Sequence, residues 1–172
     1  HCISSAASDV YKRQTPQLTV KDAISAFPLP GQSNDKLHDI IEKRSERIKK
    51  MISLVPKNGG SRADLPKEYW LPCHIRSPDS YRDVYGRMSW DKVAPTITGG
   101  CTNPSKGRFL HPEQDRAITL REAAALQTFP AGYFFSLEKG RDFAALMIGN
   151  ALPPSFIHAH AMKIKEHIES TC

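Results

Sequence analysis

The sequence contains Thr119-Leu-Arg-Glu-Ala-Ala-Ala-Leu-Gln-Thr-Phe-Pro130, a run that predicts a helix with both ends marked. Thr119 and Glu122 have capping-box spacing, in which the hydroxyl and the carboxylate each accept the other residue's backbone N–H. The helix should end at Phe129, because a residue before proline is held out of helical geometry. A later run, Ile148-Gly-Asn-Ala-Leu-Pro-Pro154, leads into a last helix. The apolar stripe of that helix consists of Ile157, Ala161, Ile164 and Ile168.

The composition bounds the kind of protein. The chain has 172 residues, enough for one ordinary domain or for a small domain and part of another, and too few for a large multi-domain enzyme. Its 40% apolar and 24% charged residues are typical of a soluble globular protein. No stretch reaches the roughly 18 consecutive apolar residues of a membrane span, which excludes membrane insertion.

The net charge of +6 makes a polyanionic partner plausible. The excess lies between Asp35 and Leu110, where 15 Lys and Arg residues face 9 Asp and Glu residues. Two interpretations stay open: a well-solvated basic surface, or a region that faces nucleic acid.

The first two thirds of the chain alternate between helical and irregular patterns. Thr19–Phe27 is predicted to be a short capped helix. Between Asp35 and Val55, apolar residues recur at helical spacing, which predicts one amphipathic helix with a basic outer face. From Pro56 to Pro112, prolines and glycines separate short runs, among them Tyr81–Arg87 and Val93–Thr98, which suggests short strands and long loops.

The sequence indicates neither a metal site nor a disulfide framework. Its cysteines lie far apart with no CxxC spacing, which fits a reducing, intracellular setting, cytoplasm or nucleoid in a bacterium. His158 and His160 lie two residues apart and therefore on different faces of the last helix. No complete nucleotide-binding glycine motif is present. The cysteines are Cys2, Cys73, Cys101 and Cys172.

Two blocks carry a family resemblance. Arg108–Pro130 and Ile148–Pro154 strongly resemble the last two conserved blocks of DNA (cytosine-5) methyltransferases, in their family order. Upstream, Asp83–Gly100 resembles the family's target-recognition region, and Thr15–Pro30 resembles the segment that enters it. The resemblance therefore covers nearly everything from Thr15 to about residue 168.

The resemblance implies an α/β family fold, of which this chain would hold one part. Residues 15–34 would be the entry segment and residues 35–118 a small mixed α+β target-recognition region with loops and short strands. Residues 119–172 would be C-terminal helices that pack on a missing Rossmann-like S-adenosylmethionine domain. Residues 1–14 look like a non-native or unstructured leader, joined to a reading frame that begins inside a gene.

The resemblance also implies site residues. The complete enzyme transfers a methyl group from S-adenosylmethionine to C5 of cytosine in duplex DNA, and Asn150 matches a family residue of the cofactor pocket. Thr96 matches a threonine that contacts a phosphate beside the target base. The expected cofactor-binding residues are Gly149, Asn150, Ala151 and Leu152. The expected DNA-binding residues, basic or close-approach positions, are Arg87, Thr96, Thr98, Gly99, Gly100, Lys106 and Arg108.

Catalytic residues are not expected in this chain. Methylation at C5 needs a thiolate that attacks C6, a carboxylic acid near N3 and a flipped base. The family takes these and its cofactor site from a Pro-Cys-Gln loop, a Glu-Asn-Val block and a Phe-x-Gly-x-Gly turn, none of which occurs here. Pro72-Cys73-His74 lacks the surrounding glycines, so Cys73 is predicted to be a buried structural cysteine. Cys101 is no nucleophile by position, although a place in the DNA-facing loop fits it.

The expected activity follows from these absences. The isolated chain should not methylate DNA, and its partners would be duplex DNA and a missing N-terminal catalytic half. Two alternatives stay open, a non-catalytic DNA-binding module and one half of a split methyltransferase. A third, weaker one is an RNA-directed relative, because a branch of the family modifies tRNA.

Overall fold

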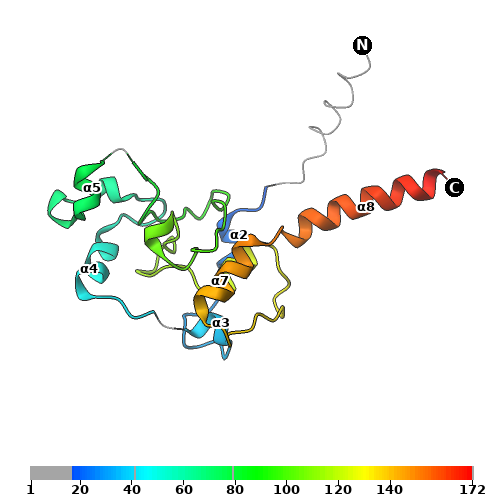
Figure 1. The fold of residues 1–172 in the computed structure, drawn as a ribbon, viewed down its shortest axis with the longest axis horizontal. Coiled ribbons are helices and arrows are strands. Elements are labelled where there is room, and N and C mark those ends of the chain that lie inside the picture. Colours follow the sequence, from blue (N-terminus) through cyan, green and yellow to red (C-terminus); the bar gives the residue numbers. More distant parts are fainter. Residues whose placement is uncertain (1–16, 41, 79, 172) are drawn as a thin grey trace, which may run out of the picture.

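The computed structural model describes residues 17–40, 42–78 and 80–171. Figure 1 shows α4 and α5 at one side of the molecule and α8 extending away from the other side, with α7 between them. The helices are α2 (Val20–Ile24), α3 (Lys36–Asp39), α4 (Glu46–Leu54), α5 (Pro72–Arg76), α6 (Leu120–Leu126), α7 (Arg141–Asn150) and α8 (Pro154–Thr171), with short 3₁₀ turns at Arg62–Asp64, Lys67–Tyr69 and Pro104–Lys106.

Helix α6 lies at the centre and packs against α2, α3 and α7. Its predicted capping box is confirmed: Thr119 N donates to Glu122 Oε2 at 2.8 Å, and Glu122 N donates to Thr119 Oγ1 at 3.1 Å. Arg116 adds two hydrogen bonds of 2.7 Å to the same carboxylate. Burial alone would raise the pKa of Glu122, but the hydrogen bonds and charge of Arg116 outweigh it and hold this pKa below its usual range. The carboxylate therefore stays ionised at the start of the helix, where the helix dipole also favours it.

Two apolar clusters form the core. The larger surrounds α6 and includes Ile24, Ile97, Phe109, Leu120 and Ile148, all buried. The smaller covers the inner face of α4 and is made of Met51, Ile52, Val55, Leu65, Tyr85 and Leu110. Leu110 belongs to the second cluster and Phe109 to the first, so adjacent residues of one segment join the two.

The predicted strands are not present in the described part of the chain. Tyr81–Arg87 and Val93–Thr98 were expected to be strands, but the β-pairings among the described residues are two isolated bridges. One joins Arg87 to Leu110 in parallel, and the other joins Leu110 to Ala117 in antiparallel fashion. The expected mixed α+β region is, in the described residues, a set of short helices and loops.

Backbone geometry explains the missing strands. Tyr81 and Tyr85 have φ values of 52° and 56°, so the first run turns where a strand would extend. In the second run, Thr96 and Thr98 are exposed and Ile97 is buried, which is the alternation of a strand. No described segment pairs with it, so it remains a single extended segment.

Helix boundaries follow the sequence in part. The capping box of α2, made by Thr19 and Asp22, is confirmed, and so is the start of α8 at Pro154. The single helix predicted over Asp35–Val55 is wrong, because α3 and α4 are separate helices and Ile40 already has an extended backbone. Helix α7 was not predicted. The proposed leader, residues 1–14, lies outside the described residues.

Helix α8 has no buried residue along its length. Its expected stripe is indeed exposed: Ile157, Ile164 and Ile168 expose 46%, 62% and 56% of their surface. The start of the helix is tied to the body, because Ser155 N and Oγ donate to Thr128 Oγ1 at 3.1 and 2.8 Å. Within the described ranges, no helix combines the length and apolarity that crossing a bilayer requires.

Arg87 is fully buried and bonded through its whole guanidinium. An arginine side chain has five N–H donors, and here each has an acceptor within the protein. The carbonyl and carboxylate acceptors, at 2.5–3.0 Å, belong to Ile52, Val55, His111, Gln114 and Asp115.

We expect Arg87→Met to destabilise the chain by about 3–5 kcal/mol, because the change leaves the buried carbonyls of Ile52, Val55 and His111 without their donor. Urea unfolding followed by circular dichroism measures the difference. Arg76→Met is the matched control, since Arg76 is exposed and should change stability by less than about 0.5 kcal/mol. Equal stability of the two variants would contradict this role of Arg87.

His111 is buried beside three cations. Its Nδ1 accepts from the backbone N–H groups of Glu113 and Gln114 at 3.1 and 3.0 Å, so the ring must be unprotonated there. Burial, and next the charge of Arg116, lower the pKa of His111 to about 4. The folded state therefore keeps this histidine neutral at pH values where the unfolded chain protonates it.

Stability should fall on acidification, because the unfolded state binds the proton more readily between pH 6.5 and about pH 4. From about pH 7 to about pH 5 the loss due to His111 should be about 2 kcal/mol. His111→Asn should flatten the slope, while His158→Asn, at an exposed position on α8, should leave it unchanged. Burial also lowers the pKa of His74, so a smaller slope should remain. Unfolding curves across this range provide the measurement.

Candidate functional site

A groove of about 670 Å³ lies between the extended segment before Gly99 and the loop that ends at Phe109. Four of the expected DNA-binding residues line it: Thr96, Thr98, Lys106 and Arg108. Lys92 also lines it, and Asp83 is the single carboxylate among the lining residues. The groove is therefore net positive, and it is bordered by two exposed hydroxyl side chains.

A tight turn closes one wall of the groove. Cys101 N donates to the carbonyl of Thr98 at 3.0 Å, which reverses the chain at Gly99 and Gly100. A Cβ atom at Gly100 would lie 2.9 Å from Cγ of Lys106, so the lysine stem rests on the bare glycine. Because Gly100 has no side chain, the aliphatic part of the exposed Lys106 side chain can pack directly on the turn.

Arg108, which lines the groove, is held in place by hydrogen bonds. Its Nη1 donates to the carbonyls of Gly59, Gly60 and Arg87 at 3.0–3.1 Å, and its Nε donates to Asp83 at 3.1 Å. Its Nη2 has no hydrogen bond to the residues that the structure describes. One edge of this guanidinium is thus structural, and Nη2 keeps its donors available.

Arg87 has to be corrected as a candidate DNA contact. The prediction rested on its basic character beside Gly86, but its side chain points away from the surface and all its N–H groups are used within the protein. A phosphate cannot compete for donors that are buried and already bonded. No signal in the sequence distinguished Arg87 from the exposed basic residues around it.

The expected cofactor residues contact the turn formed by Thr98–Cys101, called the groove turn below. Gly149 and Asn150 form the end of α7, where the sequence alone suggested only a turn. A Cβ atom at Gly149 would overlap the carbonyl group of Thr98 and the nitrogen of Gly99. The structure thus brings members of the two sets of predicted site residues, Gly149 and the Thr98–Gly99 peptide about fifty positions before it, into backbone contact.

The expected cofactor-binding residues are exposed or half-buried. Asn150 and Leu152 are exposed, and residues 149–152 do not line the groove. An exposed amide and an exposed apolar side chain fit one edge of a nucleoside site.

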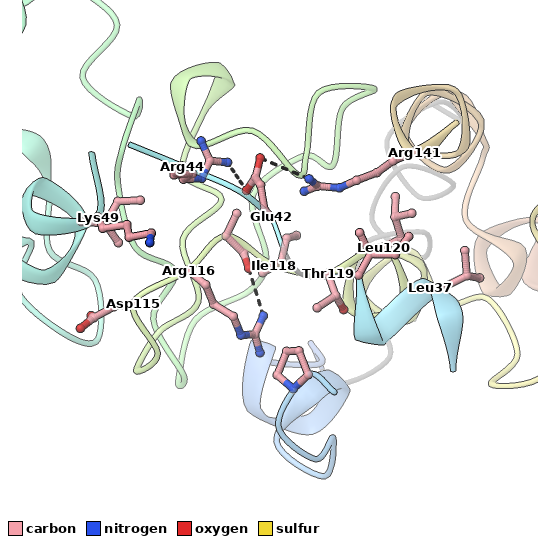
Figure 2. Close-up of a pocket in the computed structure, with 14 residues that line it drawn as sticks. Leu37, Glu42, Arg44, Lys49, Asp115, Arg116, Ile118, Thr119, Leu120 and Arg141 are labelled. Carbon is pink, nitrogen blue, oxygen red and sulfur yellow. Dashed lines mark hydrogen bonds and ion pairs between the residues drawn. The ribbon is translucent and has the colours of Figure 1, made fainter. Parts of the chain in front are cut away.

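A second cavity, of about 230 Å³, lies between α3 and the segment before α6. Figure 2 shows the carboxylate of Glu42 between the guanidinium groups of Arg44 and Arg141. Each of these arginines also donates through Nη2 to the carbonyl of Thr102, at 3.3 Å. The remaining charged lining residues are paired as well. One carboxylate thus serves two guanidinium groups, which leaves one positive charge in surplus, and the hydrogen bonds of both arginines hold the Thr102 loop.

The cysteines differ from expectation. Cys73, predicted to be buried, is exposed on α5. Cys101 is fully buried beneath the groove turn, and burial raises the pKa of its thiol to about 11. A thiol held protonated in this way is a poor nucleophile. Among the described residues, no group of three or more His, Cys, Asp or Glu side chains could hold a metal ion.

Comparison with known proteins places these features in a family context. The family model described as "C-5 cytosine-specific DNA methylase" matches residues 7–166. Type II methylase M.HgiDII of Herpetosiphon aurantiacus is 46% identical over 158 residues, which is 88% of this chain and 44% of that protein. Type II methyltransferase M1.HphI of Haemophilus parahaemolyticus is 35% identical, over 83% of this chain and 35% of its own.

A plant relative matches a similar share of the chain. DNA (cytosine-5)-methyltransferase 1A of Oryza sativa subsp. japonica is 31% identical over 83% of this chain and 8% of its own length. The chain thus spans less than half the length of each of these relatives.

Proposed function

Because the chain belongs to the C-5 cytosine-specific DNA methylase family, we propose that it is the target-recognition region and closing helices of a DNA (cytosine-5) methyltransferase. The complete enzyme would transfer a methyl group from S-adenosylmethionine to C5 of cytosine in duplex DNA. This chain would bind the DNA and would not carry out the transfer by itself. The enzyme would act inside the cell. The relatives named as type II enzymes point to a restriction-modification role.

The basic groove is the observation that carries the DNA-binding part of the proposal. Lys92 and Lys106 are exposed cations that line the groove, and Thr96 and Thr98 line it with exposed hydroxyl groups. Cations and neutral donors of this kind bind phosphate oxygens, while the glycine turn allows close approach of a backbone. We therefore propose Thr96, Thr98, Gly99, Gly100, Lys106 and the Nη2 edge of Arg108 as DNA contacts.

Surface chemistry supports a separate catalytic part. The stripe on α8 leaves large apolar side chains in water, and Leu152 and Phe156 add 63% and 52% exposed surfaces beside it. Contiguous apolar surface of this kind marks an interface. Asn150, the last residue of α7, is also exposed and precedes Leu152 by two residues. We propose that the catalytic half of the enzyme covers this surface and completes the cofactor site.

The chain should bind duplex DNA with strong salt dependence, because phosphate contacts release counterions. Lys106→Ala should weaken binding to a mixed-sequence duplex about threefold to tenfold and should lower the salt slope by about one. Lys139→Ala, an exposed lysine outside the groove, is the control. Fluorescence anisotropy between about 50 and 200 mM salt measures both quantities. Tighter binding of tRNA than of duplex would favour the RNA-directed alternative.

Methyl transfer should need both parts. We expect no transfer of labelled methyl groups to duplex DNA by the chain alone, and transfer after addition of the part of M.HgiDII outside the matched region. Ile164→Lys with Ile168→Lys should abolish this rescue, because the charges oppose burial of the stripe. Ser170→Lys, on the opposite face of α8, should not.

The outcomes separate the candidate functions. Turnover by the chain alone would overturn the proposal of a non-catalytic part. DNA binding without rescue by the added part would favour the DNA-binding module.

A further inference from the structure

Two glycines, Gly99 and Gly149, lie at the contact between α7 and the turn that follows Thr98. The peptide unit that joins Thr98 to Gly99 lies directly on Gly149, where any Cβ atom would overlap backbone atoms. One turn earlier on α7, Leu146 covers Gly99, whose own Cβ would lie 2.7 Å from Leu146 Cδ1 and 3.2 Å from its Cα. Backbone atoms cannot rotate aside as a flexible side chain can, so this contact fixes the distance between the helix and the turn.

The far end of the same turn is also tied to α7. Arg141, the first residue of α7, donates through Nη2 to the carbonyl of Thr102 at 3.3 Å. Arg44 donates to the same carbonyl, and Glu42 pairs with both arginines. Thr98–Thr102 is therefore held at both ends by α7, and its exposed residue, Thr98, lines the groove.

Glycine at position 149 is costly for α7 itself. Gly in a helix is about 1 kcal/mol less favourable than Ala, so the helix alone would be more stable with alanine there. Gln127 Nε2 donates to the carbonyl of Ile148 at 3.2 Å, which holds this last turn against α6. The glycine thus serves the contact with Thr98 and Gly99, and not the helix that contains it.

We propose that Gly149 is a positioning residue for DNA binding. The end of α7 sets the position of the peptide unit between Thr98, which lines the groove, and Gly99, and Leu146 maintains it from the neighbouring turn. Displacement of the end of α7 therefore moves the groove turn, and DNA bound in the groove restrains the end of α7 in return. This inference rests on the proposed DNA-binding function.

The test is the affinity of Gly149→Ala for a mixed-sequence duplex, by fluorescence anisotropy over the same salt range. We expect affinity to fall about fivefold or more with an unchanged salt slope, because no cation is removed. Lys106→Ala loses slope as well as affinity, so the two defects are distinguishable. Gly132→Ala is the matched control, since a Cβ there meets nothing within 4 Å.

Circular dichroism must show that the variant is folded at the assay temperature. If Gly149→Ala does not fold, Leu146→Ala decides, with an expected loss of about twofold or more at constant slope. A folded variant with wild-type affinity, or a loss that comes with a lower slope, would overturn the inference. Absence of duplex binding by the unaltered chain would instead overturn the proposed function, and the inference with it.

Discussion

The arrangement of this molecule depends on the buried guanidinium of Arg87. A cation without solvent is tolerated only where its donors are satisfied, and here four carbonyls and one carboxylate surround it. Ile52 and Val55 come from the end of α4, whereas His111 and Asp115 come from the segment before α6. The arginine therefore joins the smaller apolar cluster to the segment that leads into the larger one.

The same arginine organises the groove through its backbone. Its carbonyl accepts from Nη1 of Arg108, which in turn reaches the carbonyls of Gly59 and Gly60. An internal cation thus sets the position of a partly exposed one, with 26% of the Arg108 side chain remaining accessible. The described segments around Arg87 and Arg108 form only isolated β-bridges. Arginine side chains therefore supply hydrogen bonds to backbone carbonyls that neighbouring strands supply in a sheet.

Sequence reasoning succeeded where one short pattern determines a local structure. The capping boxes at Thr19 and Thr119 and the proline at the start of α8 specify helix starts without help from distant residues. It failed where tertiary contacts decide: α7 ends in Gly149 and Asn150, residues that favour turns, and is helical because α6 and the groove turn pack on it. For the site, Thr96 was proposed from a family pattern and Lys106 and Arg108 as basic residues among glycines, but whether a basic residue is buried or exposed could not be read from its neighbours in sequence.

The contact between Gly149 and the turn at Gly99 limits how a recognition region could be exchanged between relatives. A recognition region transplanted from one relative to another would bring its own turn geometry against a foreign helix end, and a backbone contact leaves no side chain to absorb the mismatch. Recombination that keeps α7 with its own turn avoids the conflict. The unit of exchange would then run past the recognition region and include the helix behind it, so that the boundary of a transferable module falls after residue 150 and not before residue 119.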